Sequence, residues 1–266
     1  MKTFKIILPA ILLALTVYFC NKVPITGRSQ LSLISSTEMN ALSFQQYDEF
    51  LKQSELSKNK ENTKLVKTIG AKIQKAVEQY FAQNNISDQL EGYAWEFNLV
   101  ENPEINAWCM PGGKVVVYTG ILPVTKDEAG LAVVMGHEIA HAVAQHGNER
   151  MSQGMLQEFG GLALSTALQS EPAETQSLFL GAYGVGSQVG VMLPFSRTHE
   201  SEADQMGLIF MAMAGYDPNT AVEFWTRMAD EGGQKPPEFL STHPSDDTRI
   251  EDIKKNLPEA MKYYKK

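Results

Sequence analysis

The sequence predicts a mainly α-helical protein of the α+β class with one small β-sheet. Apolar residues recur every three or four positions through much of the chain, as in Ile69, Ile73 and Val77, and this spacing is typical of amphipathic helices. A shorter stretch alternates apolar and polar residues, which is the period of a half-buried strand. With 266 residues, of which 43% are hydrophobic, the chain is long enough to bury one sizeable core.

Residues 1–20 have the pattern of a secretory signal peptide. Lys2 and Lys5 precede an apolar run over residues 6–19, which is shorter than the roughly 20 residues that cross a bilayer as a helix. Cys20 follows the run directly, which resembles a bacterial lipoprotein signal in which this cysteine is acylated. The sequence therefore predicts export to the periplasmic face of a bacterial membrane, and Asn21, in place of an aspartate retention signal, indicates the outer membrane. Plain secretion and an uncleaved segment are the alternatives.

The rest of the chain divides into an extended lead-in at 21–36 and a single domain at 37–266. Helices are predicted from Thr37 to about Leu56 and from Asn62 to about Gln83. Strands are predicted around 95–99, where apolar and polar residues alternate, and over the β-branched run 114–118, which follows a Gly-Gly turn.

Helical patterning resumes after the second strand. Thr125 is a candidate N-cap because Glu128 follows three residues later, and the helix is expected from Asp127 to about Gln145. The segment from Met151 to Leu193 is rich in Gly, Ala, Met and Ser with few charges, so it is either a buried helical pair or a flap.

Composition excludes several classes of protein. The formal net charge of −8 argues against a nucleic-acid-binding protein, which needs a basic face. Two cysteines, Cys20 and Cys109, cannot make a disulfide scaffold or a four-cysteine metal site. All five histidines lie in the second half of the chain.

The motif His137-Glu138-Ile139-Ala140-His141 is the strongest chemical signal. Its two histidines lie one above the other on a helix, so both imidazoles can reach one zinc ion. Glu138 can face a water molecule at the metal as a general base. Gly136 is small and leaves room beside the metal. The motif therefore predicts a hydrolytic zinc site.

Such a site needs a third protein ligand. The metzincin pattern is excluded because Ala144 and Gly147 stand where it requires glycine and histidine. His146 points away around the helix and is expected at the surface. The remaining candidates lie in the stretch His199 to Asp204, where Glu200 and Asp204 share a helix face, so that one can bind zinc and the other can hold a histidine N–H. Glu202 lies on another face and is expected in solvent.

Several separated motifs resemble one family of zinc endopeptidases, the HtpX heat-shock protease and CAAX prenyl endopeptidase type of metallopeptidase family forty-eight, and in particular its soluble exported lipoprotein branch. They follow one another in the order found in that family. Besides the zinc motif they are Pro24-Ile25-Thr26-Gly27-Arg28, Asn106-Ala107, Pro111-Gly112-Gly113, Ser196-Arg197, Glu200-x-x-Ala203-Asp204, Ala214-Gly215-Tyr216-Asp217-Pro218, His243-Pro244 and Arg249.

The resemblance implies a zincin-like (gluzincin) domain and assigns roles to particular residues. Glu200 would be the third zinc ligand and Asp204 its supporting partner. The strand at Lys114–Tyr118 would be an edge that receives an extended substrate. His243 would lie near the metal, where it either stabilises the oxyanion or fills the open zinc position and keeps the enzyme latent. Arg249 would orient the site, bind the oxyanion or only form a salt bridge.

The predicted function is hydrolysis of peptide bonds in envelope or periplasmic proteins, in quality control. One Zn²⁺ per chain, held by His137, His141 and Glu200, would polarise the scissile carbonyl, and Glu138 would move the proton. The expected partners are extended protein or peptide substrates, a membrane reached through the lipid anchor, and envelope assembly complexes. The alternative is a non-proteolytic or latent assembly factor that keeps a zinc site.

Overall fold

The computed structural model describes residues 20–169, 173–188, 193–230, 243 and 247–265. The chain forms two compact units, one of residues 37–144 with 198–266 and a smaller one of residues 1–36 with 145–197. The predicted signal segment at 1–19 lies outside the described residues. Within the described part, no helix is both long and apolar enough to cross a membrane.

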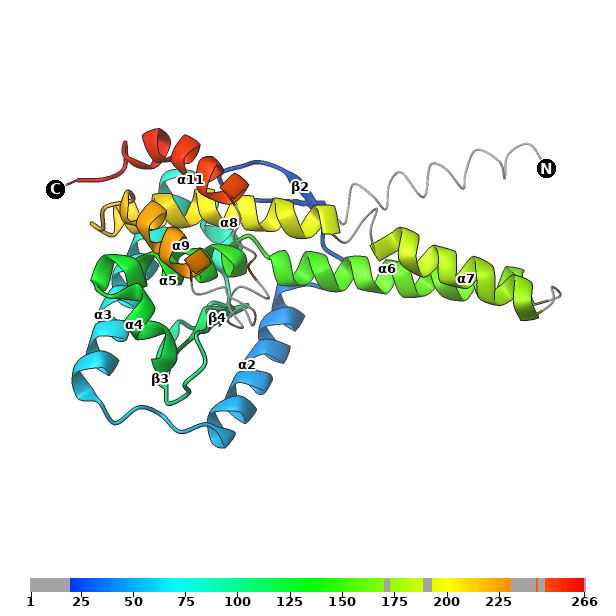
Figure 1. Cartoon of the computed structure of the whole chain (residues 1–266), viewed down its shortest axis with the longest axis horizontal. Helices are drawn as coiled ribbons and strands as arrows, with labels where there is room; N and C mark the ends of the chain where they lie inside the picture. The colour runs from blue at the N-terminus through cyan, green and yellow to red at the C-terminus, as the bar shows by residue number, and fades with distance from the viewer. Residues whose placement is uncertain (1–19, 170–172, 189–192, 231–242, 244–246, 266) are drawn as a thin grey trace. The chain divides into compact units, whose positions relative to one another are not determined.

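The larger unit places helices around a three-stranded sheet, as the α+β prediction requires (Figure 1). Its helix α5 contacts α3, α9 and strand β4, and is therefore the central helix of the unit. The described helices of the larger unit are α2 (Ser36–Gln53), α3 (Lys60–Gln83), α4 (Leu122–Thr125), α5 (Glu128–Val143), α8 (Leu193–Met213), α9 (Thr220–Asp230) and α11 (Asp247–Ala260). Helix α2 begins at the unit boundary, and the first residues of α8 belong to the smaller unit. Its described part also contains two short 3-10 helices, η1 (Ser87–Leu90) and η2 (Thr119–Ile121).

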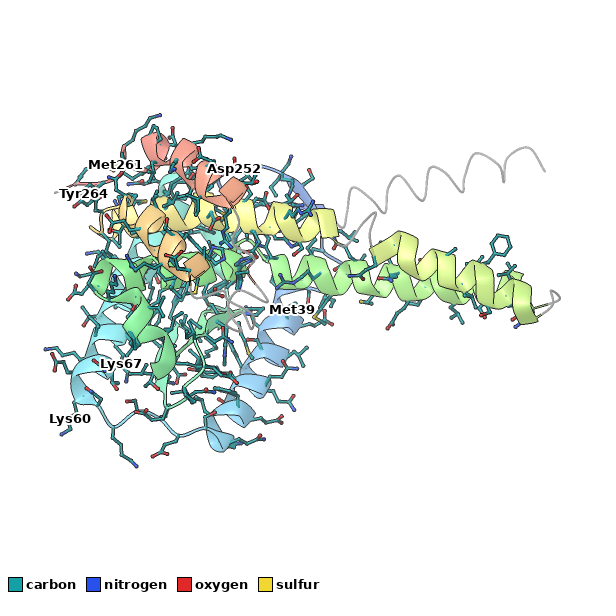
Figure 2. All side chains as sticks on the ribbon, in the orientation of Figure 1. Met39, Lys60, Lys67, Asp252, Met261 and Tyr264 are labelled. Carbon is teal, nitrogen blue, oxygen red and sulfur yellow. The ribbon has the colours of Figure 1, made fainter. Side chains whose placement is uncertain are left out.

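Helix α3 is amphipathic, as its spacing predicts. Lys60 and Lys67 lie on its exposed face (Figure 2). Its buried face packs against strand β3 at Gly70, where an added Cβ would come within 2.3 Å of the Phe97 ring. A glycine is needed there because any larger residue would push the helix off the sheet.

The sheet has the strand order β3-β5-β4, with β3 at Glu96–Val100, β4 at Ala107–Met110 and β5 at Lys114–Tyr118. Strand β5 pairs parallel to β3 and antiparallel to β4. The predicted edge strand at Lys114–Tyr118 is therefore wrong, since that strand is the central one. Its β-branched residues Val115, Val116 and Val117 are fully buried, as expected for a strand with a neighbour on each side.

Helix α5 carries the zinc motif and is buried over almost its whole length from Gly130 onward. Its N-cap is Asp127, whose carboxylate accepts a hydrogen bond from the Gly130 N–H at 2.8 Å. The predicted cap at Thr125 is wrong because Thr125 ends the short helix α4 and its hydroxyl donates to the Leu122 carbonyl instead.

The smaller unit contains a two-stranded hairpin, β1 (Cys20–Lys22) with β2 (Ser29–Leu31), and the helices α6 (His146–Ala167) and α7 (Ala173–Ser187). The lead-in predicted as extended at 21–36 thus forms a hairpin. The Arg28 guanidinium forms two hydrogen bonds, of 2.9 and 2.7 Å, with the buried Glu149 carboxylate at the start of α6. The Leu33 N–H donates to the Ser152 hydroxyl, so hydrogen bonds hold the lead-in against the first turns of α6.

The segment from Met151 to Leu193 resolves largely into the helices α6 and α7, which pack against each other (Figure 1). Of the two predicted alternatives it is the helical pair, but the pair is not buried. Phe159, Leu162 and Phe179 are among its exposed side chains.

Candidate active site

Helix α5 positions the first three site residues. His137 and His141 lie one turn apart on the same face, and their imidazole rings are buried. Glu138 is also buried, and its Oε1 has no hydrogen-bond partner in the described structure. A buried carboxylate oxygen without a hydrogen bond is costly, which marks Glu138 as a residue placed for chemistry rather than for folding.

Helix α8 supplies two carboxylates, Glu200 and Asp204, one turn apart. It approaches α5 closely where two glycines face each other. An added Cβ on Gly136 would lie 3.0 Å from the Gly207 carbonyl oxygen, and one on Gly207 would lie 3.0 Å from the His137 backbone nitrogen. Gly136 therefore makes room for α8, not for the metal as the sequence indicated.

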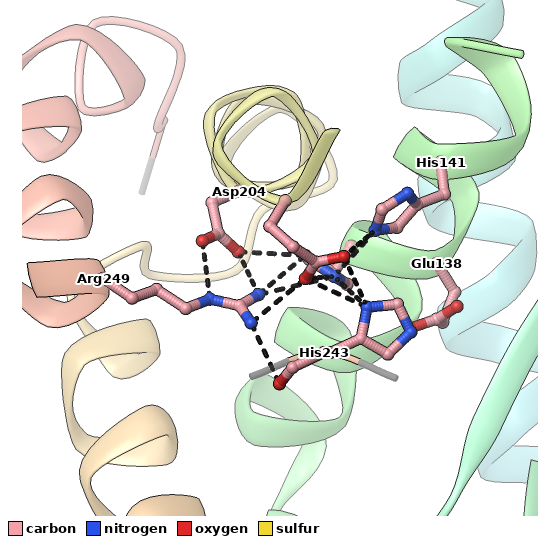
Figure 3. A network of polar contacts seen from close by, with 7 residues as sticks. Glu138, His141, Asp204, His243 and Arg249 are labelled. Carbon is pink, nitrogen blue, oxygen red and sulfur yellow. Dashed lines mark hydrogen bonds and ion pairs between the residues drawn. The ribbon is translucent and has the colours of Figure 1, made fainter. Parts of the chain in front are cut away.

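Four potential ligand atoms converge from α5, α8 and residue 243 (Figure 3). The Nε2 atoms of His137 and His141 are 3.1 Å apart, and they lie 3.4 and 3.2 Å from the Glu200 carboxylate oxygens. The Nδ1 atom of His243 lies 3.1 Å from His137 Nε2 and 3.0 Å from both oxygens of Glu200.

These four residues fit a zinc ion. The ligand atoms all lie within 4.8 Å of one another. Bonds of about 2.0–2.1 Å in a tetrahedron separate the ligands by roughly 3.3 Å, which is close to the distances found between these atoms. Histidine nitrogens and a carboxylate oxygen are also donors that zinc prefers.

Asp204 and Arg249 hold the ligands in place from behind. Asp204 Oδ1 lies 2.9 Å from His137 Nδ1, so the proton of that imidazole faces Asp204 and the lone pair of Nε2 faces the cluster. Arg249 donates to both Asp204 oxygens at 2.8 Å. Its Nη1 lies 3.1 Å from Glu200 and donates to the His243 carbonyl at 3.2 Å. The guanidinium packs over the Trp225 ring at 3.5 Å.

His243 also contacts the second half of the site. Its Nε2 lies 3.4 Å from Glu138 Oε1, while its Nδ1 belongs to the ligand cluster. This imidazole therefore lies between the three ligands from the helices and the candidate base.

The electrostatics of the cluster follow from burial and from these contacts. Burial alone would lower the pKa of His137, but Asp204 and Glu200 outweigh it and raise that pKa to about 9. Burial alone would raise the pKa of Glu200, yet the three histidines hold it well below its usual range. The pKa of Glu138 is raised because of burial, although His243 partly opposes the shift. The cluster is thus arranged to compensate positive charge.

Every predicted metal and catalytic residue lies in this one site, but two neighbours differ from expectation. His146 and Glu202, expected in solvent, are buried, as is His199, and none of the three belongs to the ligand cluster. Their burial depends on parts of the chain that are distant in sequence, which local spacing could not indicate. Trp225 was missed, because a single tryptophan in an amphipathic helix has the same signature as any core residue.

The fold and the site define a class of protein: a zincin-like metallopeptidase domain with a His-Glu-x-x-His helix and zinc as its cofactor. The model of peptidase family M48 matches residues 69–257, and the chain belongs to that family. The predicted family is thereby confirmed. Its finer assignment, to the HtpX and CAAX type and to a lipoprotein branch, stays a prediction.

Three relatives illustrate the range of the family. The mitochondrial metalloendopeptidase OMA1 of Schizosaccharomyces pombe is 38% identical over 71% of this chain and 53% of its own length. The mitochondrial metalloendopeptidase OMA1 of Homo sapiens is 31% identical over 90% of this chain and 46% of its own length. The beta-barrel assembly-enhancing protease of Yersinia pestis is 33% identical over 63% of this chain and 35% of its own length. The chain spans about half or less of the length of these proteins.

These relatives correct the predicted location. The relatives that cover most of the chain are mitochondrial enzymes, and the bacterial matches are shorter. The predicted location, the periplasmic face of a bacterial outer membrane, is therefore wrong. The strand pairing of Cys20 with Leu31 involves its backbone alone and says nothing of a lipid.

Proposed function

We propose that the chain is a zinc-dependent endopeptidase that hydrolyses peptide bonds of protein substrates bound in extended form. The observation that carries the proposal is the buried Glu138 carboxylate beside a cluster of three histidines and Glu200. A purely structural zinc site has no need of such a base. When bound, zinc would polarise the scissile carbonyl and lower the pKa of a water molecule.

The residues of this chain would divide the remaining work. Glu138 would take the proton of the attacking water and pass it to the leaving amine, and its raised pKa suits both transfers. Asp204 would keep His137 in the ligating tautomer. Of the roles left open for Arg249, orientation has the best support, because its nitrogens already contact Asp204, Glu200 and the His243 carbonyl.

The substrate would add a strand to β4 rather than to β5. Strand β4 lies at one end of the strand order and packs against α5. The Ala107 N–H bonds its neighbour's side chain, Asn106 Oδ1, at 2.8 Å, which indicates that it faces away from β5. By the alternation of an antiparallel ladder, the backbone of Cys109 also faces the open side, where an extended peptide can pair with it.

Protein quality control is the proposed role. The name of the Yersinia pestis relative, a beta-barrel assembly-enhancing protease, links that relative to the assembly of β-barrels. For this chain the proposed substrates are unfolded or misassembled proteins, because an edge strand pairs only with segments that are extended.

Removal of the metal is expected to abolish cleavage of casein. Incubation with 1,10-phenanthroline should stop the reaction, and one equivalent of Zn²⁺ per chain should restore it. Because the pKa of His137 is about 9 without metal, zinc must displace a proton at neutral pH. Apparent affinity should therefore fall by about tenfold for each pH unit below that value. Cleavage that survives complete loss of zinc, measured by metal analysis, contradicts the proposal.

A second candidate, a latent enzyme or assembly factor, is favoured by the position of His243. A hydrolytic zinc site keeps one position open, whereas here the His243 Nδ1 atom joins the other three ligands. Its Nε2 atom also lies beside Glu138. The imidazole would thus occupy the place that a water molecule needs.

His243→Ala separates the two roles of this histidine. If His243 blocks the site and the open state is populated at about 10%, the variant should cleave casein about tenfold faster at equal zinc content. If His243 stabilises the oxyanion instead, activity should fall by about 10²–10³-fold. Measured zinc content and melting temperature check that the variant is loaded and folded.

A further inference from the structure

Helix α6 carries a row of exposed apolar side chains that neither the fold nor the site requires. Met151, Met155, Phe159 and Leu162 are spaced so that they lie within an arc of about 80° on the helix. They are 42%, 38%, 61% and 66% exposed, respectively. Leu156 extends the same side at 51% exposure. Large apolar side chains that are gathered in this way mark a contact surface.

Helix α7 does not cover this row. It contacts α6 through Tyr183, whose hydroxyl donates to the Gln157 carbonyl at 3.0 Å and would meet a Cβ on Gly160 at 2.1 Å. Gly160 lies roughly 100° or more around the helix from the apolar row. Helix α7 adds its own exposed aromatic ring, Phe179, at 52% exposure.

The distribution of charged residues indicates the kind of surrounding that contacts the row. Only three charged residues occur between 151 and 187, Glu158, Glu171 and Glu174, whereas the chain as a whole is 20% charged. No lysine or arginine stands between Arg150 and Arg197. A helix that uses one face for a protein partner keeps charges on the face that remains in water. The lack of charges around both helices favours a low-dielectric surrounding instead.

The position of the lead-in, residues 21–36, also favours an apolar surrounding for the row. Strand β2 and the residues after it lie over the first turns of α6, through Glu149 and Ser152, next to the start of the apolar row. Strand β2 pairs with β1, which begins at Cys20, and the apolar sequence of residues 6–19 ends just before it. A second apolar sequence thus directly precedes, along the chain, the hairpin that packs on α6.

We propose that the α6–α7 pair lies in the interface of a lipid bilayer, with Phe159, Leu162 and Phe179 inserted among the acyl chains. The helices do not span the bilayer, since no described helix is both long and apolar enough to do so. The lack of basic residues means that apolar burial, not attraction to anionic lipid, provides the affinity.

A tryptophan at the centre of the row reports insertion directly. In the full chain, the emission added by Phe159→Trp, obtained by subtracting the emission of the parent with its three native tryptophans, should shift to the blue and be quenched by nitroxide-labelled phosphatidylcholine vesicles. The matched control is Leu56→Trp, an exposed leucine of the larger unit at 46% exposure, which should not respond. Because the signal arises at residue 159, binding through residues 6–19 alone cannot produce it.

Two further measurements, one on a double variant and one with anionic lipid, complete the test. Phe159→Gln with Leu162→Gln should weaken binding to phosphatidylcholine vesicles by roughly tenfold per substitution, with an unchanged melting temperature. Anionic lipid should add nothing for a chain of net charge −8. The proposal is overturned if residue 159 is quenched no more than residue 56. It is also overturned if the blue shift occurs without vesicles, which would indicate cover by a second copy or by the chain itself.

Discussion

Glu138→Gln is expected to lower cleavage of casein by about 10³-fold while zinc stays bound. The amide keeps the size and shape of the side chain but cannot accept a proton from water. Glu138 is not one of the four clustered ligands, so zinc content should be unchanged. The loss should appear in kcat, measured under saturating substrate, because the change removes a proton acceptor and not a binding contact.

Glu128→Gln is the matched control for this experiment. It removes a carboxylate from the exposed first turn of the same helix, α5, and should leave cleavage within about twofold of the parent. If Glu138→Gln cleaves as well as Glu128→Gln in preparations free of other proteases, Glu138 is not the base. The latent-factor interpretation would then be the better one.

Glu200→Ala is expected to have the second large effect, on the metal itself. The change removes one ligand and also the carboxylate that lies 3.1 Å from Arg249 Nη1. The guanidinium would then be compensated by Asp204 but no longer by Glu200, which opposes binding of a cation. Zinc affinity should fall by more than the roughly 100-fold that loss of a supporting partner costs, and casein cleavage should fall with it.

The control for Glu200→Ala is Glu223→Gln on α9, whose side chain is 79% exposed. Titration with a zinc-sensitive dye should give the parent affinity for this control. The decisive comparison in Glu200→Ala is between the loss of zinc binding and the loss of cleavage. If zinc binds normally and only cleavage is lost, Glu200 acts on the substrate and is not a ligand.

The sequence predicted the site well because most of its members are close together on helices. A spacing of four residues places His137 above His141 and Glu200 above Asp204 whatever surrounds them. His243 and Arg249 came from the resemblance to a family, since residues so far along the chain have no local pattern that ties them to α5. Trp225 had neither kind of signal.

Errors arose where the outcome depends on neighbours. The strand at Lys114–Tyr118, predicted from its β-branched run, is confirmed, but the edge position implied by the family resemblance is wrong. A local pattern shows that a strand forms and which side chains are buried, but not which strands pair. His146 and Glu202 were placed in solvent from their position on one helix, but other elements cover them.

The sequence by itself determined the helical class, the zinc motif and the shared faces that carry the ligands, since each depends on a period of a few residues. The tertiary structure alone decided the order of the strands, the closeness of α5 and α8 at Gly136 and Gly207, and the position of His243 between the ligands and Glu138. It also decided that the apolar row of α6 stays exposed. The physical reason is that helix geometry comes from bonds four residues apart, whereas packing depends on the free energy of contacts between residues that are distant in the chain.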